Sequence, residues 1–330
     1  MSKTPIHPIY KQECDRSELQ SPILLGVIAN AMETKDYSQI QALRAAGDEQ
    51  LSKIPLPDII KTTKEVTGGP DNVNVKLVIY RPIGSEDEIL PIILYFHGGG
   101  YMFGSTYTHG KSVIDFANSA HAAVIFVDYS LSPEAQFPLA IEEGFAALSW
   151  VRENAAEING DPEKIVVLGD SAGGNLSAVL SLMARDRGLK DAIKAQVLIY
   201  PYVSDSDDFP SRKVTSDEAD YFISSDILNA FITNYFPVPV MELKNPYGTP
   251  LILPVEKLTD LPPALVLTAE CDGLRDEGEA YYSKLLEAGN DAIGVRVLGA
   301  IHGFMTIQGP PQYRFGLNTC VSFIKDKLDI

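Results

Sequence analysis

The chain has 330 residues, of which 45% are hydrophobic and 22% are charged, and its formal net charge at pH 7 is -17. This composition is typical of a globular protein and excludes intrinsic disorder, which requires few hydrophobic residues. The acidic excess argues against nucleic acid or an anionic membrane surface as the main partner, because both require a surface rich in Lys and Arg.

The cysteines and the N-terminal residues bear on the cellular compartment. Cys14, Cys271 and Cys320 are too few and too scattered for a disulfide framework or for a zinc site built from paired cysteines. The first residues lack the apolar core of a signal peptide, and the apolar run at 21–32 is shorter than the roughly 20 residues of a bilayer span. We therefore expect a cytoplasmic protein with no stable membrane insertion.

In chain order, the first predicted elements are helical. Residues 1–55 contain two short helical patterns, at 19–32 and 36–52, before any strand pattern. An antiparallel strand follows at 73–80, where apolar and polar residues alternate as on a strand with one exposed face. It can pair with the segment 62–67 across a turn rich in glycine.

Six continuous apolar runs come next, and their length suits parallel strands buried on both faces. They are residues 91–96, 122–128, 164–169, 195–200, 263–269 and 292–298. Helical patterns separate them, such as the apolar stripe of Ile141, Phe145, Leu148 and Val151. The sequence predicts an α/β core with an eight-stranded, mostly parallel sheet and helices on both faces.

Residues 202–247 interrupt this alternation. The segment has no convincing strand pattern and holds eight aromatic residues, including Tyr221 and Phe231. A long insertion in a compact domain is usually a functional lid or a disordered segment, and the aromatic residues disfavour disorder. We expect 1–55 and 202–247 to form a helical cap on a core that spans 56–330.

A nucleophile motif ends the strand at 164–169. Residues 169–173 read Gly-Asp-Ser-Ala-Gly, which fits the pattern G-x-S-x-G between a strand and a helix. In that context a sharp turn presents the serine at the carboxyl edge of the sheet, beside a helix N-terminus that favours developing negative charge. Ser171 is therefore the predicted nucleophile, and a glycine-rich turn that only permits close packing is the alternative.

A serine hydroxyl needs a base, and the base needs an acid to orient it. His302 follows the last predicted strand, in the order Ser, acid, His that this motif favours. Four acidic residues follow the preceding strand: Glu270, Asp272, Asp276 and Glu277. Asp272 lies three residues past the predicted strand end, whereas Asp276 and Glu277 suit the first turn of a helix. We predict His302 as the base and Asp272 as the acid.

The loop at 97–101 reads His-Gly-Gly-Gly-Tyr and follows the third predicted strand. Consecutive glycines let backbone N–H groups approach a substrate, so Gly99 and Gly100, with Ala172 after the nucleophile, are the predicted oxyanion donors. The loop lacks the lysine of a phosphate-binding P-loop. His97 is expected to anchor it by hydrogen bonding.

Together these motifs resemble the hormone-sensitive-lipase-like carboxylesterases of the α/β-hydrolase fold, also called bacterial family IV esterases. The resemblance covers roughly residues 75–310 and rests on HGGGYMFGS, DYSLSPEAQFPLAIEEG, GDSAGGN, DGLRDEG and HGF. It implies the triad and oxyanion residues named above, and a cap built from the N-terminal segment and an insertion after the sixth strand.

The expected activity is serine hydrolysis of carboxylic esters with a short to medium acyl group, or of a lactone. Two alternatives stay open: a dedicated biosynthetic lactonase or hydrolase for an aryl or polycyclic substrate, and a non-catalytic small-molecule receptor of the same fold. No cofactor or metal is expected, since the carboxylates of 272–277 lack companion ligands and fit a helix start. An exposed edge strand would allow a homodimer as well as a monomer.

Overall fold

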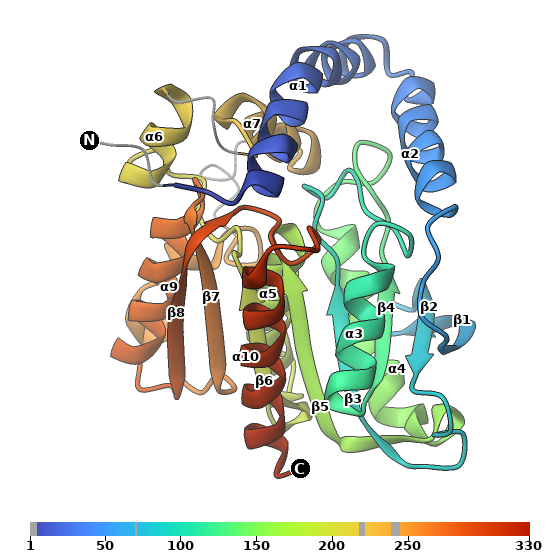
Figure 1. Ribbon diagram of the computed structural model, residues 1–330. Helices are drawn as coiled ribbons and strands as arrows, with labels where there is room; N and C mark the ends of the chain where they lie inside the picture. Colours follow the sequence, from blue (N-terminus) through green and yellow to red (C-terminus); the bar gives the residue numbers. More distant parts are fainter. Residues whose placement is uncertain (1–4, 70, 218–221, 239–244) are drawn as a thin grey trace.

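The computed structural model describes residues 5–69, 71–217, 222–238 and 245–330, with the backbone alone for 214–217. An eight-stranded sheet lies at its centre, in the order β1-β2-β4-β3-β5-β6-β7-β8 (Figure 1). The strands are β1 Ile60–Gly68, β2 Val73–Arg81, β3 Leu90–Phe96, β4 Ala123–Asp128, β5 Gly160–Asp170, β6 Ile193–Ile199, β7 Ala264–Cys271 and β8 Ala292–Ile301. Strand β2 runs antiparallel to β1 and β4, and the other neighbours are parallel, which confirms the predicted sheet.

Two strands differ from their predicted burial. The alternation in β2 holds only as far as Lys76, and from Leu77 to Arg81 every residue is buried, because β1 and β4 flank it and helices cover both faces. Strand β8 is the opposite case. It was expected to be covered on both faces, but it forms the edge of the sheet, and only its last residues are continuously buried.

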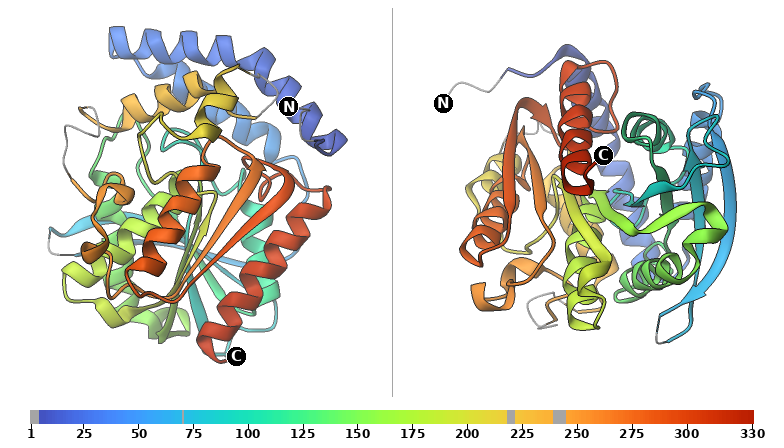
Figure 2. Two further views of the ribbon diagram at one scale, coloured as in Figure 1. Left: turned by 90° about the vertical axis from the view of Figure 1, so that its left-hand side faces the viewer. Right: turned by 90° about the horizontal axis from the view of Figure 1, so that it is seen from below.

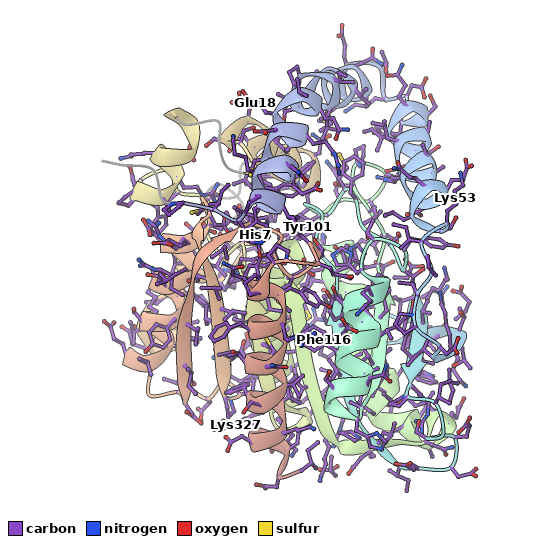
Figure 3. All side chains as sticks on the ribbon, viewed as in Figure 1. His7, Glu18, Lys53, Tyr101, Phe116 and Lys327 are labelled. Carbon is purple, nitrogen blue, oxygen red and sulfur yellow. The ribbon has the colours of Figure 1, made fainter. Side chains whose placement is uncertain are left out.

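Helices cover both faces of the sheet (Figures 1 and 2). The N-terminal α1 Pro8–Thr34 and α2 Ser38–Leu51 precede the strands. The others are α3 Gly110–Ala120, α4 Leu139–Asn154, α5 Ala172–Asp186, α6 Pro210–Asp217, α7 Ser225–Tyr235, α9 Arg275–Glu287 and α10 Pro311–Leu328. Residues of α3 and α10 share one core layer, in which Phe116 is fully buried (Figure 3). Residues of α4 and α5 share the layer on the other face, beside α9.

Helices α1, α2, α6 and α7 lie beyond the carboxyl ends of the parallel strands, at the top of Figure 1. Helix α1 begins eleven residues before the predicted start at 19, and it packs on α7 through Leu24, Ile28 and Ala31. The division of the chain into a cap and a core stays a prediction, and Tyr221 of the predicted insertion lies outside the described residues. Among the described residues, no helix has the length and apolar character needed to cross a membrane.

Candidate active site

Ser171 lies at the turn between β5 and α5, with backbone angles φ 57° and ψ -118°. A positive φ is rare for a residue with a side chain and persists only where the surrounding structure holds it. Close packing does so here, because a Cβ on Gly169 would overlap the backbone of Gly173, and one on Gly173 would overlap the carbonyl of Phe96. The geometry of the turn therefore requires both glycines of the predicted motif.

The other two predicted triad residues meet Ser171 at this edge of the sheet. His302 directly follows β8, and its Nε2 lies 2.9 Å from Oγ of Ser171. Asp272 directly follows β7, and its Oδ2 lies 2.8 Å from Nδ1 of His302. The other carboxylate oxygen of Asp272 accepts the N–H of Leu274 at 2.9 Å, and all three side chains are buried. A carboxylate at this position can orient the imidazole through Nδ1 and leave Nε2 to accept a hydroxyl proton.

The predicted oxyanion residues flank the same serine. Gly99 and Gly100 follow β3 with φ of 109° and 62°, values at which a side chain would strain the backbone, and both line the cavity above Ser171. Ala172 is the first residue of α5, directly after Ser171. Within the described parts of the chain, the N–H groups of Gly99, Gly100 and Ala172 have no backbone acceptor.

His97 holds the start of the glycine loop, as the sequence predicts. Its Nδ1 lies 2.7 Å from the carbonyl oxygen of Gly98, and its ring stacks on Tyr129 with 4.2 Å between centroids. Burial lowers the pKa of His97 to about 4, because a low-polarity surrounding disfavours the charged imidazole, and the nearby His109 adds to this effect. His97 is thus neutral at pH 7 and supports the loop by packing and hydrogen bonding.

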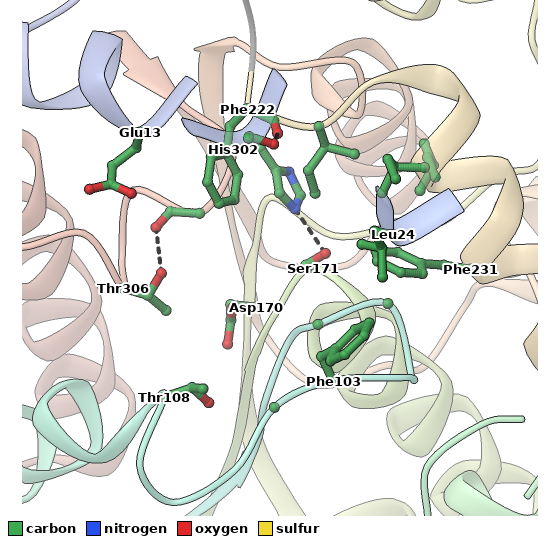
Figure 4. Close-up of a pocket in the computed structure, with 18 of the residues that line it drawn as sticks. Glu13, Leu24, Phe103, Thr108, Asp170, Ser171, Phe222, Phe231, His302 and Thr306 are labelled. Atoms are coloured by element: carbon green, nitrogen blue, oxygen red, sulfur yellow. Dashed lines mark hydrogen bonds between the residues drawn. The ribbon is translucent and has the colours of Figure 1, made fainter. Parts of the chain in front are cut away.

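A cavity of about 580 Å³ opens above Ser171, between the sheet edge and helices α1 and α7 (Figure 4). Its two sides differ in polarity. Leu24, Phe103 and Phe231 lie on one side of Ser171, and Glu13, Thr108 and Thr306 lie on the other. The apolar side suits a hydrocarbon group, and the polar side suits a group that forms hydrogen bonds.

The sequence prediction missed the residues of α1 that line this cavity. Glu13, Ser17, Gln20 and Leu24 recur at spacings of four, three and four, so they share one face of the helix. The hydroxyl of Ser17 donates to the carbonyl of Phe222 at 2.6 Å, which ties α1 to the segment before α7. The helical spacing could have identified this face, but no local signal says what the face covers.

The chain is similar in sequence to several known esterases. A model of the alpha/beta hydrolase fold family matches residues 93–306. An arylesterase of Saccharolobus solfataricus is 36% identical over 277 residues, which cover 84% of this chain and 88% of that protein. A carboxylesterase of Mycobacterium tuberculosis is 38% identical over 245 residues, which cover 73% of this chain and 75% of that protein.

The similarity extends to solved structures. One structure from a study of two fungal esterases of Rhizomucor miehei matches with a TM-score of 0.90 at 44% sequence identity, and the match covers 99% of both chains. The described part of the chain therefore shares its fold with an esterase, including the helices that line the cavity.

Proposed function

Because this chain belongs to the hormone-sensitive-lipase-like carboxylesterases of the α/β-hydrolase fold, it is a carboxylic ester hydrolase, and we propose that Ser171, His302 and Asp272 are its catalytic triad. One observation carries the proposal: Nε2 of His302 lies 2.9 Å from Oγ of Ser171, while its Nδ1 lies 2.8 Å from Asp272. Hydrogen bonds of this length are what a nucleophile, its base and the orienting acid require.

The reaction follows from these contacts. His302 takes the proton of the Ser171 hydroxyl as Oγ attacks the ester carbonyl carbon, and the carbonyl oxygen gains the negative charge. The N–H groups of Gly99, Gly100 and Ala172 stabilise that charge, an effect worth about 10²- to 10³-fold in rate for a donor of this kind. The bond between the carbonyl carbon and the alcohol oxygen then breaks, and His302 gives the proton to the leaving alcohol. Water attacks the acyl-enzyme as His302 takes its proton, and His302 returns that proton to Oγ of Ser171 as the carboxylic acid leaves.

The cavity supports an ester of short to medium length. Its apolar side, with Leu24, Phe103 and Phe231, would take the acyl chain, and the polar side would take the alcohol. A volume of about 580 Å³ also accommodates an aryl group or a lactone, so a dedicated hydrolase for such a substrate is the second candidate.

We further propose that the enzyme acts in the cytoplasm without a bound cofactor, as a monomer or a homodimer. The acidic composition and the scattered cysteines support a reducing compartment and a small-molecule partner. The edge strand β8 supports the dimer, because the side chains of Ile293 and Leu298 are exposed on it. Light scattering of the purified protein would distinguish the two states.

The test is hydrolysis of p-nitrophenyl acetate, butyrate, octanoate and dodecanoate, a naphthyl ester and a lactone by the wild type and Ser171→Ala. Ser181→Ala is the matched control, since it removes a buried hydroxyl of the same helix α5. We expect Ser171→Ala to lose at least about 10³-fold in kcat, and a fluorophosphonate to label the wild type at Ser171. Full activity in folded Ser171→Ala would refute the triad, and a preference for the naphthyl ester or the lactone would favour the second candidate.

A further inference from the structure

A second contact between a carboxylate and an imidazole lies beside the proposed triad. Oδ2 of Asp170 is 3.5 Å from Nε2 of His109, and both side chains are buried. Asp170 directly precedes Ser171, His109 directly precedes α3, and both residues line the cavity. Figure 4 shows Asp170 below Ser171, on the side of Thr108. The reaction described above assigns no role to either residue.

Asp170 connects the nucleophile turn to the glycine loop. Its Oδ1 accepts the N–H of Gly98 at 3.1 Å and the hydroxyl of Tyr95 at 3.0 Å. The approach is so close that a Cβ on Gly98 would lie 2.5 Å from Oδ2 of Asp170. The position of Gly98 sets the direction of the next two residues, Gly99 and Gly100, whose N–H groups are the proposed oxyanion donors. A shift of Asp170 would therefore move those donors.

A buried carboxylate next to the nucleophile also has an electrostatic consequence. Burial opposes the ionisation of Asp170, yet His109, Tyr95 and His97 together hold the pKa of Asp170 below its usual value. An unbalanced negative charge at this position would repel the charge that develops on the substrate oxygen. A positive charge on His109 would cancel that repulsion.

The contacts of Thr108 fix the ring of His109 beside Asp170. The Thr108 hydroxyl donates to the carbonyl of Ser105 at 3.0 Å and lies 2.8 Å from Nδ1 of His109. The hydroxyl can donate or accept toward Nδ1, so this contact holds the imidazole ring in place in either case. Nε2 faces the carboxylate of Asp170, which accepts only from a protonated nitrogen. When His109 is protonated on both nitrogens, its contact with Asp170 is an ion pair.

We propose that Asp170 and His109 are positioning residues: their buried ion pair fixes the glycine loop and removes the repulsion that an isolated carboxylate would exert on the oxyanion. This inference rests on the proposed function, because it assigns the oxyanion donors to the same loop. Neither residue exchanges a proton with the substrate. Their effect is on the stability of the tetrahedral intermediate, so it should change kcat and leave KM nearly constant.

The test compares His109→Leu, which removes the donor to Asp170, with His109→Gln, whose amide can still donate. His121→Gln is the control, since His121 ends the same helix α3 but is exposed and pairs with Glu88. The concentration of active enzyme is determined by fluorophosphonate titration, so that misfolded protein does not lower the apparent kcat. We expect kcat to fall roughly 10- to 100-fold in His109→Leu, with KM within about twofold, and to recover only in part in His109→Gln, which restores the donor but not the charge.

A second measurement separates positioning from a general structural effect. A trifluoromethyl ketone forms an oxyanion when Ser171 adds to it, so its affinity should weaken by the same factor as kcat/KM in His109→Leu. If His109→Leu does not fold, His109→Phe serves instead, because it keeps a ring of similar shape and removes the donor to Asp170. Unchanged kcat, or a rise in KM alone, in a variant that folds would overturn the inference. Activity in Ser171→Ala would instead overturn the proposed function, so the two failures are distinguishable.

Discussion

The ring of Tyr101 stacks on the ring of Tyr235 with 3.8 Å between centroids and 5° between planes. Tyr101 is the last residue of the loop at 97–101, and Tyr235 is the last residue of α7, so the pair connects the proposed oxyanion loop to a helix that covers the cavity. Both rings are buried. Disturbing the helix should therefore affect the chemistry as well as the stability.

Replacing Tyr235 by Leu should lower both stability and kcat. The loss of a buried ring should reduce the free energy of unfolding by about 2 kcal/mol, and kcat should fall because Gly99 and Gly100 lose their support. Tyr281→Leu is the control, since Tyr281 is equally buried but lies in α9. Urea unfolding would show a similar loss of stability in both variants. Initial rates would show a loss of kcat in Tyr235→Leu alone. Equal kcat in the two variants would contradict the coupling.

Phe231 should set the length of the acyl chain. A Cβ on Gly100 would overlap its ring, which closes the apolar side of the cavity together with Phe103. Phe231→Ala should raise the ratio of kcat/KM for p-nitrophenyl octanoate over butyrate by roughly 10-fold, because the freed volume accommodates more methylene groups. Phe323→Ala in α10 removes a ring of similar burial away from the cavity and should leave the ratio unchanged. An unaltered ratio in Phe231→Ala would mean that the acyl chain binds elsewhere.

The ion pair of Arg212 with Glu277 should be important for stability. Nε and Nη2 of Arg212 lie 2.9 Å and 2.6 Å from Oε2 of Glu277, and both side chains are buried. Arg212→Met leaves the carboxylate without its cation. It should lower the free energy of unfolding, measured in urea at pH 7, by about 3 to 5 kcal/mol. Arg296→Met breaks a partly exposed pair and should cost less than about 1 kcal/mol. A similar loss of unfolding free energy in both variants would contradict the prediction that the buried pair contributes more.

His97 should make stability depend on pH. Burial lowers its pKa to about 4 in the folded chain, whereas an unfolded histidine titrates near 6.5, so the unfolded state binds more protons between these values. The stabilisation is present above pH 6.5 and is lost as the pH falls toward 4, by about 3 kcal/mol. In His97→Asn this loss should be smaller by that amount, while the exposed His121→Asn should follow the wild type in urea unfolding from pH 7 to pH 4. Parallel curves for wild type and His97→Asn would show that His97 does not cause the dependence.

Local patterns and topology were enough to predict the sheet and the three residues that meet at its edge. The serine motif is local, and His302 and Asp272 were found because the carboxyl ends of parallel strands meet at one edge. The exposure of β8 was not predictable in the same way. Its apolar run is similar to those of the central strands, and only its place at the end of the sheet leaves it uncovered.

The other parts of the candidate site could not be predicted, because they depend on contacts between side chains that are distant in the sequence. Asp170 occupies a variable position of the serine motif and His109 is a lone histidine after a loop, so nothing in the sequence links the two. The polar face of α1 was also missed, because a helix of mixed composition shows its buried side only once its partner is known.

The bond between Ser17 and Phe222 joins residues 205 positions apart in the chain. At a synthesis rate of about 5 to 20 residues per second, α1 would leave the ribosome roughly 10 to 40 s before its partner segment exists. During that time Leu24, Ile28 and Ala31 lack the helix that covers them. The wall of the catalytic cavity is thus completed late in synthesis, and the nascent chain must keep an apolar helix from aggregating until then.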